Sequence, residues 1–321
     1  MAYDGSLLFD TGIDNSGFTS GVQKLSGIAT VALGNITSAI VQQISSAAAQ
    51  IPAQMVEMGS SFEASMSQVA ATSGITAATQ EYAKLGSAAK EMGATTQFSA
   101  SQAAEALNYL ALAGYDADKS IQALPTVLNV AASGGMELAA ASDMITDAMS
   151  ALGLQMDDLN TFADQLAITA QKSNTSVAQL GEAILTVGGT AKSLAGGVVE
   201  MNTVLGILAD NGIKGAEGGT ALRNVILSLS APTSTAAAAL ESLKVSAFDA
   251  NGNMRPLEDT FADINTALSQ LTEQDKNAVL SDIFNKVDLK SVNALLGTSA
   301  ERFDELSGYI SDCDGAAAEM A

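Results

Sequence analysis

One pattern repeats along most of this chain: a helix-capping residue, a stretch of strong helix formers, and a turn of Gly, Ser, Asn or Asp. Only four prolines occur in 321 residues, and Ala, Leu, Met, Gln and Glu favour helices. The pattern predicts a mainly all-α fold, a multi-helix bundle of short helices. The predicted helices are 57–72, 79–92, 100–113, 118–132, 137–152, 157–171, 177–190, 198–210, 218–230, 233–243, 258–270, 273–285, 288–296 and 299–310.

Local signals place the ends of several of these helices. Ser99 and Ser176 are each followed three residues later by Gln, which matches the capping-box pattern. Thr272 with Asp275 indicates an N-cap with an acidic residue in the first turn. Glycines suited to the position just after a helix end are Gly114, Gly153 and Gly212.

One segment predicts a small β-hairpin among the helices. Asn251-Gly252 is the strongest kind of short hairpin signal when apolar residues flank it. Pro256 limits its strand to a sheet edge or ends it. The flanking apolar residues are Val245, Ala247, Phe248, Met254 and Leu257.

A set of residues between 99 and 135 recurs, without a gap, 77 residues further along the chain. The repeat predicts a duplicated helical hairpin, with chance similarity in an Ala-rich sequence as the alternative. The matching residues of the first copy are Ser99, Gln102, Glu105, Ala106, Thr126, Val127, Leu128, Ala132 and Gly135.

Residues 1–56 differ from the rest and predict a short extended segment followed by a long amphipathic helix. No charged residue occurs from Leu25 to Val56. The apolar positions step by three, four and four, a period of 11 residues that favours a straight or slightly right-handed bundle. The predicted self-association stripe is Val22, Leu25, Ala29, Leu33, Ile36, Ile40, Ile44, Ala47 and Ile51.

The sequence of this N-terminal helix allows two other interpretations. It could be an ordinary amphipathic helix that packs on its own domain. A membrane span is disfavoured, because polar side chains break the stretch and no run of about 18 apolar residues exists. Pro52 should kink or stop the helix.

Composition and charge exclude several functions. The net charge of −21 disfavours binding to nucleic acid and to anionic membranes. Histidine is absent, so the most common general base and metal ligand are missing and a Ser-His-Asp arrangement cannot be built. Cys313 is the one cysteine, which fits a reducing cytoplasm. We expect no enzyme activity and no catalytic, cofactor or metal site.

Three weaker motifs each have a simpler explanation. The Gly-rich stretch 212–219, with basic residues nearby, could bind an anion at a helix start, but a flexible connector explains it as well. Residues 249–253 space Asp and Asn as a calcium loop does, yet Met254 and Thr260 stand where that loop needs Gly and Glu. "DCDG" (312–315) indicates a solvated turn. The methionines predicted to fill gaps in the core are Met55, Met58, Met136, Met144 and Met149.

Six stretches of the chain form a characteristic set when they are taken in order. They are "SSFEASMSQVAATSG" (60–74), "TQFSASQAAEALNYLALAGYDADKSIQALPTVLNVAASGGMELAAASDMITDAMSALGL" (96–154), "FADQLAITAQKSNTSVAQLGEAI" (162–184), "LADNGIKGAEGGTALRNVILSLSAP" (208–232), "DANGNMRPLEDTF" (249–261) and "LSDIFNKVDLKSVNALL" (280–296). Together they resemble the shared core region of phage tail tape measure proteins. The opening "LLFDTGIDNSGF" also resembles the start of that family. One departure is Phe284-Asn285, where relatives tend to have Phe-Gly; Asn also tolerates the left-handed conformation, so a turn should survive.

The resemblance implies a structural protein without catalytic residues. A tape measure protein is a scaffold for tail tube assembly, determines tail length and leaves the tube on DNA ejection. The implied partners are the tail tube protein, tail assembly chaperones, tail tip or baseplate proteins and further copies of the chain. Direct nucleic-acid binding is not expected, and membrane contact is confined to ejection. The implied location is the virion, in the tail tube lumen, and the host cytoplasm during assembly.

We expect three parts: residues 1–56, a helical core domain at 57–310, and the start of a truncated downstream helix at 311–321. Asp314 would cap that last helix, and the measuring part would lie beyond residue 321. The alternative function is a secreted or injected helical protein of the pore-forming or filament type. The Ala-, Ser- and Thr-rich composition without Trp and the uncharged N-terminal stretch point that way.

Overall fold

The computed structural model describes residues 58–321. The predicted extended segment, the N-terminal helix and its self-association stripe lie outside the described residues, as do Pro52 and Met55. The chain divides into two compact units, Met1–Ser61 and Phe62–Ala321. The elements from α3 onward belong to the second unit.

Helices dominate the described residues, and no strand occurs among them. A first helix passes through residues 58–73. The later elements are α3 (Gln80–Thr95), α4 (Ala100–Leu112), α5 (Ala117–Gly134), α6 (Leu138–Leu152), η1 (Met156–Asp158), α7 (Leu159–Lys172), α8 (Val177–Val187), η2 (Gly188–Ser193), α9 (Gly197–Asp210), α10 (Gly215–Ser230), α11 (Ser234–Leu243), α12 (Leu257–Leu268), α13 (Glu273–Phe284), η3 (Lys286–Asp288), α14 (Leu289–Leu296), α15 (Ala300–Ser311) and α16 (Ala316–Met320). The predicted all-α class is confirmed, and the predicted helices match these bounds to within a few residues.

The capping signals are confirmed in most of their detail. Ser99 and Gln102 form the full capping box at the start of α4. Ser176 accepts a hydrogen bond from the backbone N–H of Gln179 at the start of α8. The Gln179 side chain does not complete a box, because its oxygen accepts instead from the Thr175 hydroxyl. The predicted helix-ending glycines all have positive φ: Gly114, Gly153 and Gly212.

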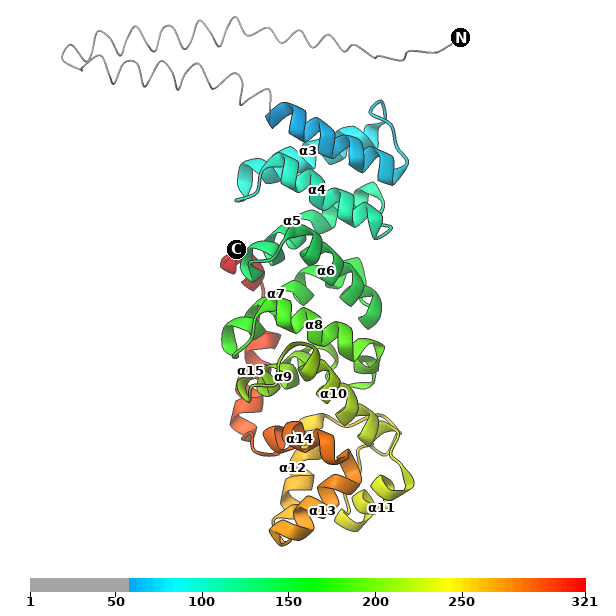
Figure 1. Cartoon of the computed structure of the whole chain (residues 1–321), viewed down its shortest axis with the longest axis vertical. Coiled ribbons are helices and arrows are strands. Elements are labelled where there is room, and N and C mark those ends of the chain that lie inside the picture. Colours follow the sequence, from blue (N-terminus) through cyan, green and yellow to red (C-terminus); the bar gives the residue numbers. More distant parts are fainter. Residues whose placement is uncertain (1–57) are drawn as a thin grey trace, which may run out of the picture. The chain divides into compact units, whose positions relative to one another are not determined.

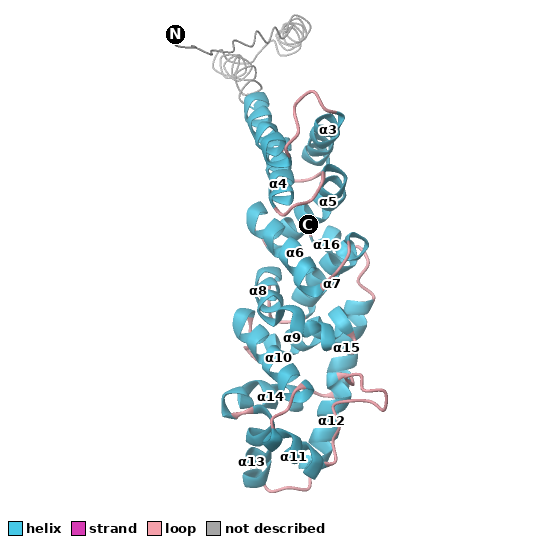
Figure 2. Cartoon of the chain, turned by 90° about the vertical axis from the view of Figure 1, so that its right-hand side faces the viewer, coloured by secondary structure: helices cyan, strands magenta, loops and turns pink. Residues whose placement is uncertain are grey.

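The first eight numbered α-helices form two stacked layers (Figures 1 and 2). Consecutive helices pair as antiparallel hairpins: α3 with α4, α5 with α6, α7 with α8, and α9 with α10. Each helix also packs on the helix two places away, so α3, α5, α7 and α9 form one layer and α4, α6, α8 and α10 the other. This is the arrangement of a repeat protein, in which each unit buries its apolar face against its neighbours.

The 77-residue repeat corresponds to a structural duplication of two hairpins. α4 begins at Ala100 and α8 at Val177, 77 residues later; the same spacing separates the starts of α6 at Leu138 and α10 at Gly215. α5 and α9 end on the same motif: Gly135 and Gly212 both have positive φ and donate to the carbonyl three residues earlier. Duplication of a helical unit therefore explains the repeat better than chance similarity does.

The predicted β-hairpin is wrong. Only one isolated antiparallel bridge forms, between Phe248 and Met254. α11 ends at Leu243 and α12 begins at Leu257, which leaves few residues on either side of the turn. Two such short segments, with no third strand beside them, do not make a stable sheet. The Asn-Gly signal located the turn correctly but not the strands.

Small residues allow the helices to approach closely. Many alanines of the core are fully buried, among them Ala103, Ala106, Ala123 and Ala141. In this core the larger side chains include Phe261 and Phe284, whose rings stack with centroids 5.8 Å apart. Of the methionines predicted to fill the core, Met144 and Met149 are buried and Met136 is partly buried, whereas Met58 is exposed.

The C-terminal helices return along the layer of odd-numbered helices. α11 to α14 follow the stack, and α15 then packs on α9 and α7. α16 continues in the same direction and packs on α7 and α5 (Figure 2). Asp314 does not cap α16; its N-cap residue is Gly315, with φ +80°.

Candidate functional site

No group of three or more His, Cys, Asp or Glu residues is arranged to hold a metal ion within residues 58–321. Helices long and apolar enough to cross a membrane are likewise absent from this part of the chain. The predicted self-association stripe from Val22 to Ile51 lies outside the described residues.

The Gly-rich stretch 212–219 forms neither an anion-binding loop nor a flexible connector. Gly218 and Gly219 lie inside α10, where a Cβ on Gly219 would stand only 2.7 Å from the Cβ of Thr186 on α8. At the start of α10, the Glu182 carboxylate lies 2.6 Å from the position of a Cβ on Gly215. The glycines therefore allow α10 to pack tightly on α8, and a carboxylate stands where an anion would have to bind.

The loop resembling a calcium site is held by its own aspartate. The Asp249 carboxylate accepts hydrogen bonds from the backbone N–H groups of Asn251 and Asn253, both at 2.8 Å. The hydrogen bonds from Asn253, with those from Asn251, lower the pKa of Asp249 although it is fully exposed. "DCDG" is a turn in which Cys313 is buried.

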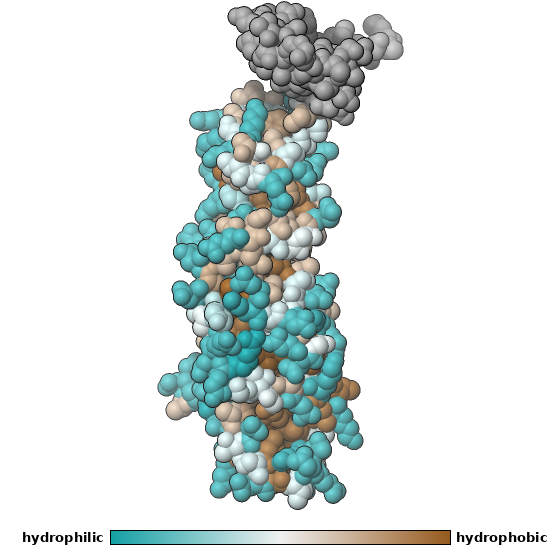
Figure 3. Space-filling view, turned by 90° about the vertical axis from the view of Figure 1, so that its left-hand side faces the viewer, coloured by the Kyte–Doolittle hydropathy of each residue, from teal (hydrophilic) through white to brown (hydrophobic). Residues whose placement is uncertain are grey.

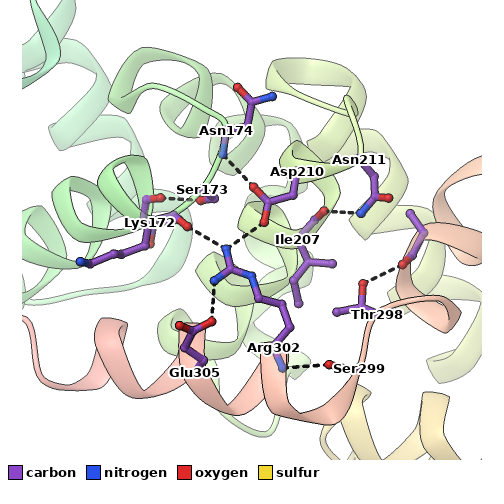
Figure 4. Close-up of polar contacts among 12 residues, drawn as sticks. Lys172, Ser173, Asn174, Ile207, Asp210, Asn211, Thr298, Ser299, Arg302 and Glu305 are labelled. Atoms are coloured by element: carbon purple, nitrogen blue, oxygen red, sulfur yellow. Dashed lines mark hydrogen bonds and ion pairs between the residues drawn. The ribbon is translucent and has the colours of Figure 1, made fainter.

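Arg302, on α15, lies at a junction of polar contacts between helices (Figure 4). One guanidinium nitrogen donates to the Lys172 carbonyl at 2.7 Å and to the Asp210 carboxylate at 2.9 Å. The other donates to Glu305 at 3.0 Å. Since these partners belong to the end of α7, the end of α9 and α15 itself, Arg302 joins three helices.

Asp210 extends this junction to the turn after α7. Its second oxygen accepts from the backbone N–H of Asn174 at 2.8 Å, so one carboxylate binds both the turn and the guanidinium. The hydrogen bond to Asp210 raises the pKa of Arg302, and burial opposes that effect. The Arg302 and Asp210 side chains are 30% and 31% exposed, so water screens their attraction less than at an open surface.

A second polar contact fixes the start of α12. Glu200, in the first turn of α9, accepts hydrogen bonds from the backbone N–H groups of Gly196 at 2.7 Å and Leu257 at 2.5 Å. Burial raises the pKa of Glu200, an effect that the two hydrogen bonds offset in part. Beside it lies a cavity of about 140 Å³ whose wall includes Pro256 and Phe303.

A third polar contact fixes α16. Asp164 lies on α7 and is only 7% exposed. Its two oxygens accept from the backbone N–H groups of Gly315 at 2.9 Å and Ala317 at 2.8 Å. Asp164 thus satisfies helix-start donors that a capping side chain within α16 would normally bind. Burial, and next the charge of Asp164, raise the pKa of the Cys313 thiol.

These three contacts have the same structural role. Arg302, Glu200 and Asp164 each join the C-terminal helices to the stacked repeat, and each polar group is already satisfied by protein partners. No motif in the sequence indicates these contacts. The one available signal was Asp164, a charged residue within the apolar run of α7 next to Phe162, Leu166 and Ala167.

The exposed surface carries few large apolar side chains, and they lie on different elements. Leu112 is on α4, Leu185 on α8, Leu227 on α10 and Val287 in η3. Figure 3 shows one face of the molecule, on which hydrophilic side chains alternate with smaller apolar patches. Isolated apolar residues are normal on protein surfaces, so these side chains do not by themselves indicate a binding site.

Comparison with known proteins connects this architecture to phage tails. A family model described as "Phage-related minor tail protein" matches residues 86–285. The chain is 35% identical over 269 residues to a "Tape measure protein" of Pneumococcus phage Dp-1, which covers 84% of this chain and 23% of that protein. It is 28% identical over 293 residues to a "Probable tape measure protein" of Escherichia phage P2, covering 89% of this chain and 36% of that protein.

The chain thus spans about a quarter of one relative and about a third of the other. No solved structure matches the chain. The matched family segment begins in α3 and ends just after α13, so it contains the whole duplicated stack from α4 to α10.

Proposed function

We propose, because the chain belongs to the phage-related minor tail protein family, that it forms part of a tape measure protein. A structural role in a phage tail follows from the family. The observation that carries the finer proposal is the 35% identity to the Dp-1 tape measure protein across 84% of this chain. The family resemblance of the stretches between residues 60 and 296 agrees with it.

In this proposal the whole protein extends through the tail tube, sets tail length, serves as a scaffold for tube assembly and leaves on DNA ejection. Its partners would be the tail tube protein, tail assembly chaperones, tail tip or baseplate proteins and further copies of the chain. Its location would be the tube lumen of the virion, after assembly in the host cytoplasm. The net charge of −21 supports a protein that does not adhere to DNA passing through the same lumen.

The stacked helices contribute little length of their own. Helices that fold back as hairpins advance along the stack by about one helix diameter, roughly 10 Å, per hairpin. An extended helix of the same residues would be several times longer. We propose that the ruler lies in the greater part of the relatives' length that this chain does not span, and that residues 62–321 provide a folded tail component.

The test is a phage that lacks this chain. Without it we expect no tails of regular length by negative-stain electron microscopy, with normal tails restored by the unaltered gene in trans. A gene carrying Lys84→Ala serves as the matched control, since Lys84 forms only an exposed pair with Asp118. Regular tails of unchanged length in the absence of the chain would overturn the proposal.

We further propose that this chain performs no hydrolysis or group transfer, as the names of its relatives imply. The full chain is without histidine, and the polar groups joined at Arg302, Glu200 and Asp164 are occupied by protein partners. Purified protein should release no soluble fragments from peptidoglycan or from a casein substrate. Cleavage that disappears on substitution of a residue between 62 and 321 would contradict this.

The secreted or injected alternative gains no support from the comparisons, since both relatives are named as tape measure proteins. The two functions differ in where the protein is found. If the chain is part of a tape measure protein, purified virions should contain it. If it is secreted or injected, it should be found in the culture medium or in target cells.

A further inference from the structure

Residues 299–320 contact three successive helices of one layer. α15 packs on α9 and α7, and α16 packs on α7 and α5. Figures 1 and 2 show this segment beside the stack, with the end of α16 near α5. In a repeat protein each unit normally touches only its neighbours, so a segment that contacts α5, α7 and α9 together restrains how they move relative to one another.

The apolar attachment of this segment is uneven. Phe303, Leu306 and Ile310 are buried on α15, and Leu306 approaches so close to Gly206 that a Cβ there would lie 2.8 Å from it. On α16, Ala317 is buried, and Ala316 and Met320 are partly buried against the core. Since the free energy of burial scales with apolar area, α15 is held much more firmly than α16.

The polar attachment of α16 rests on one buried carboxylate. Asp164 accepts both of its hydrogen bonds from the backbone N–H groups of Gly315 and Ala317. Asp164 forms no salt bridge with another of the described residues. These two charge-assisted hydrogen bonds therefore form the polar attachment of α16 to α7, and weakening them should favour the open state.

We propose that residues 299–320 form a clasp that fixes α5, α7 and α9 against one another, and that the clasp opens from its α16 end. In the opening step α16 leaves α5 and α7, Asp164 and Cys313 reach water, and α15 stays bound through Arg302 and its apolar face. The segments that open first in a protein are those with the least buried apolar surface. This inference does not depend on the proposed tail function.

Cys313 provides a direct readout, because it is the one cysteine of the chain and is 6% exposed. A thiol reagent such as dithionitrobenzoate can react with it only after α16 moves away. Asp164→Asn keeps the shape of the side chain but replaces one carboxylate oxygen by an NH2 group. That group is a donor, so one of the two backbone N–H groups loses its acceptor. We expect the variant to react at least tenfold faster than the unaltered protein, with unchanged helix content by circular dichroism.

The matched control is Asp147→Asn, which removes one exposed charge from α6, in the opposite layer. It should leave the reaction rate unchanged. Because Asp164 also raises the pKa of Cys313, rates are compared at equal thiolate fraction, obtained from the pH dependence of the reaction in each variant. An Asp164→Asn protein that reacts no faster than Asp147→Asn on this basis would overturn the proposal.

A second measurement on the unaltered protein remains decisive if Asp164→Asn does not fold. Opening of α16 alone exposes little surface. The rate of Cys313 labelling should therefore depend only weakly on urea concentration, far less than the free energy of global unfolding does. Hydrogen exchange should likewise be faster in residues 315–320 than in α5 and α7. Labelling with the same urea dependence as global unfolding would show that no separate opening exists.

Discussion

Arg302 shows how one side chain can connect parts of the chain that lie far apart in sequence. Its guanidinium binds the carbonyl of Lys172 and the carboxylate of Asp210, 130 and 92 residues away along the chain. Planar Arg suits this position, because its fixed fork of donors reaches several acceptors at once. Lys at this position could bind one of them but not hold all three in place.

Arg302→Ala should lower the free energy of unfolding by about 1–3 kcal/mol, since charge-assisted hydrogen bonds of partly buried groups are lost. Urea denaturation followed by circular dichroism measures the change. Lys84→Ala is the control; it removes an exposed pair and should change stability by less than about 0.5 kcal/mol. Equal effects of the two substitutions would mean that Arg302 is an ordinary surface residue.

Asn285 occupies a backbone conformation that favours glycine, with φ +65° and ψ +159°. The left-handed conformation predicted here is confirmed in its positive φ, but ψ lies outside the left-handed helical region. Non-Gly residues in this region carry strain of about 1–3 kcal/mol. Glycine at this position would adopt the same backbone conformation without that strain.

Asn285→Gly should raise the free energy of unfolding by about 1 kcal/mol, after the greater freedom of glycine in the unfolded chain is subtracted. The melting temperature should rise by about 2–4 °C for a chain of this size. Asn277→Gly in the middle of α13 gives the matched comparison and should be destabilising, because glycine is a poor helix former. A fall in melting temperature for Asn285→Gly would contradict this account.

At the scale of elements, the even-numbered layer depends on residues without long side chains. Gly181 on α8 stands against Met144 of α6, and Gly219 on α10 stands against α8. Each glycine lets a neighbouring helix approach to a distance that a Cβ would prevent. The Ala-rich composition thus reflects close helix packing rather than a lack of core.

The N-terminal stripe remains a prediction at this scale. We expect residues 22–51 to self-associate in parallel, with Ile36, Ile40 and Ile44 each contributing about 1.5–3 kcal/mol per chain on burial. Analytical ultracentrifugation of a peptide of residues 1–56 should show an oligomer that Ile40→Asp abolishes. Monomer alone at high concentration would favour the alternative, in which the helix packs on its own domain.

At the scale of the whole molecule, net charge and helix packing determine different properties. The excess of acidic residues gives a net charge of −21, which governs association with other charged molecules but not the fold. The duplication governs the fold, because two units of similar sequence stack through similar helix contacts. The returning helices then add contacts that no pair of neighbouring repeats could make.

This charge predicts that the protein does not bind DNA. Fluorescence anisotropy with labelled duplex DNA should show no binding at about 50 mM salt, where contacts to phosphate are strongest. Binding that weakens steeply as salt is added would reveal a basic surface on the protein and would contradict the prediction.

Local sequence signals determined the helices and most of their ends. Ser99 caps α4 through Gln102, three residues away, and such contacts form whenever those few residues come together. The predicted helix bounds, the positive φ at Gly114, Gly153 and Gly212, and the 77-residue duplication all depend on neighbouring residues or on direct comparison of the sequence with itself. The resemblance to tape measure proteins was visible in the same way.

Tertiary structure decided what lies between helices. Asp164 caps α16 from 151 and 153 residues away, Arg302 binds Asp210, and Gly219 packs on α8; each depends on which helix faces meet. The hairpin failed for the same reason, since Asn251-Gly252 can form a turn alone but strands need partners that the neighbouring helices do not supply. Short-range hydrogen bonds are set by adjacent residues, whereas contacts between distant residues form only after the helices have packed.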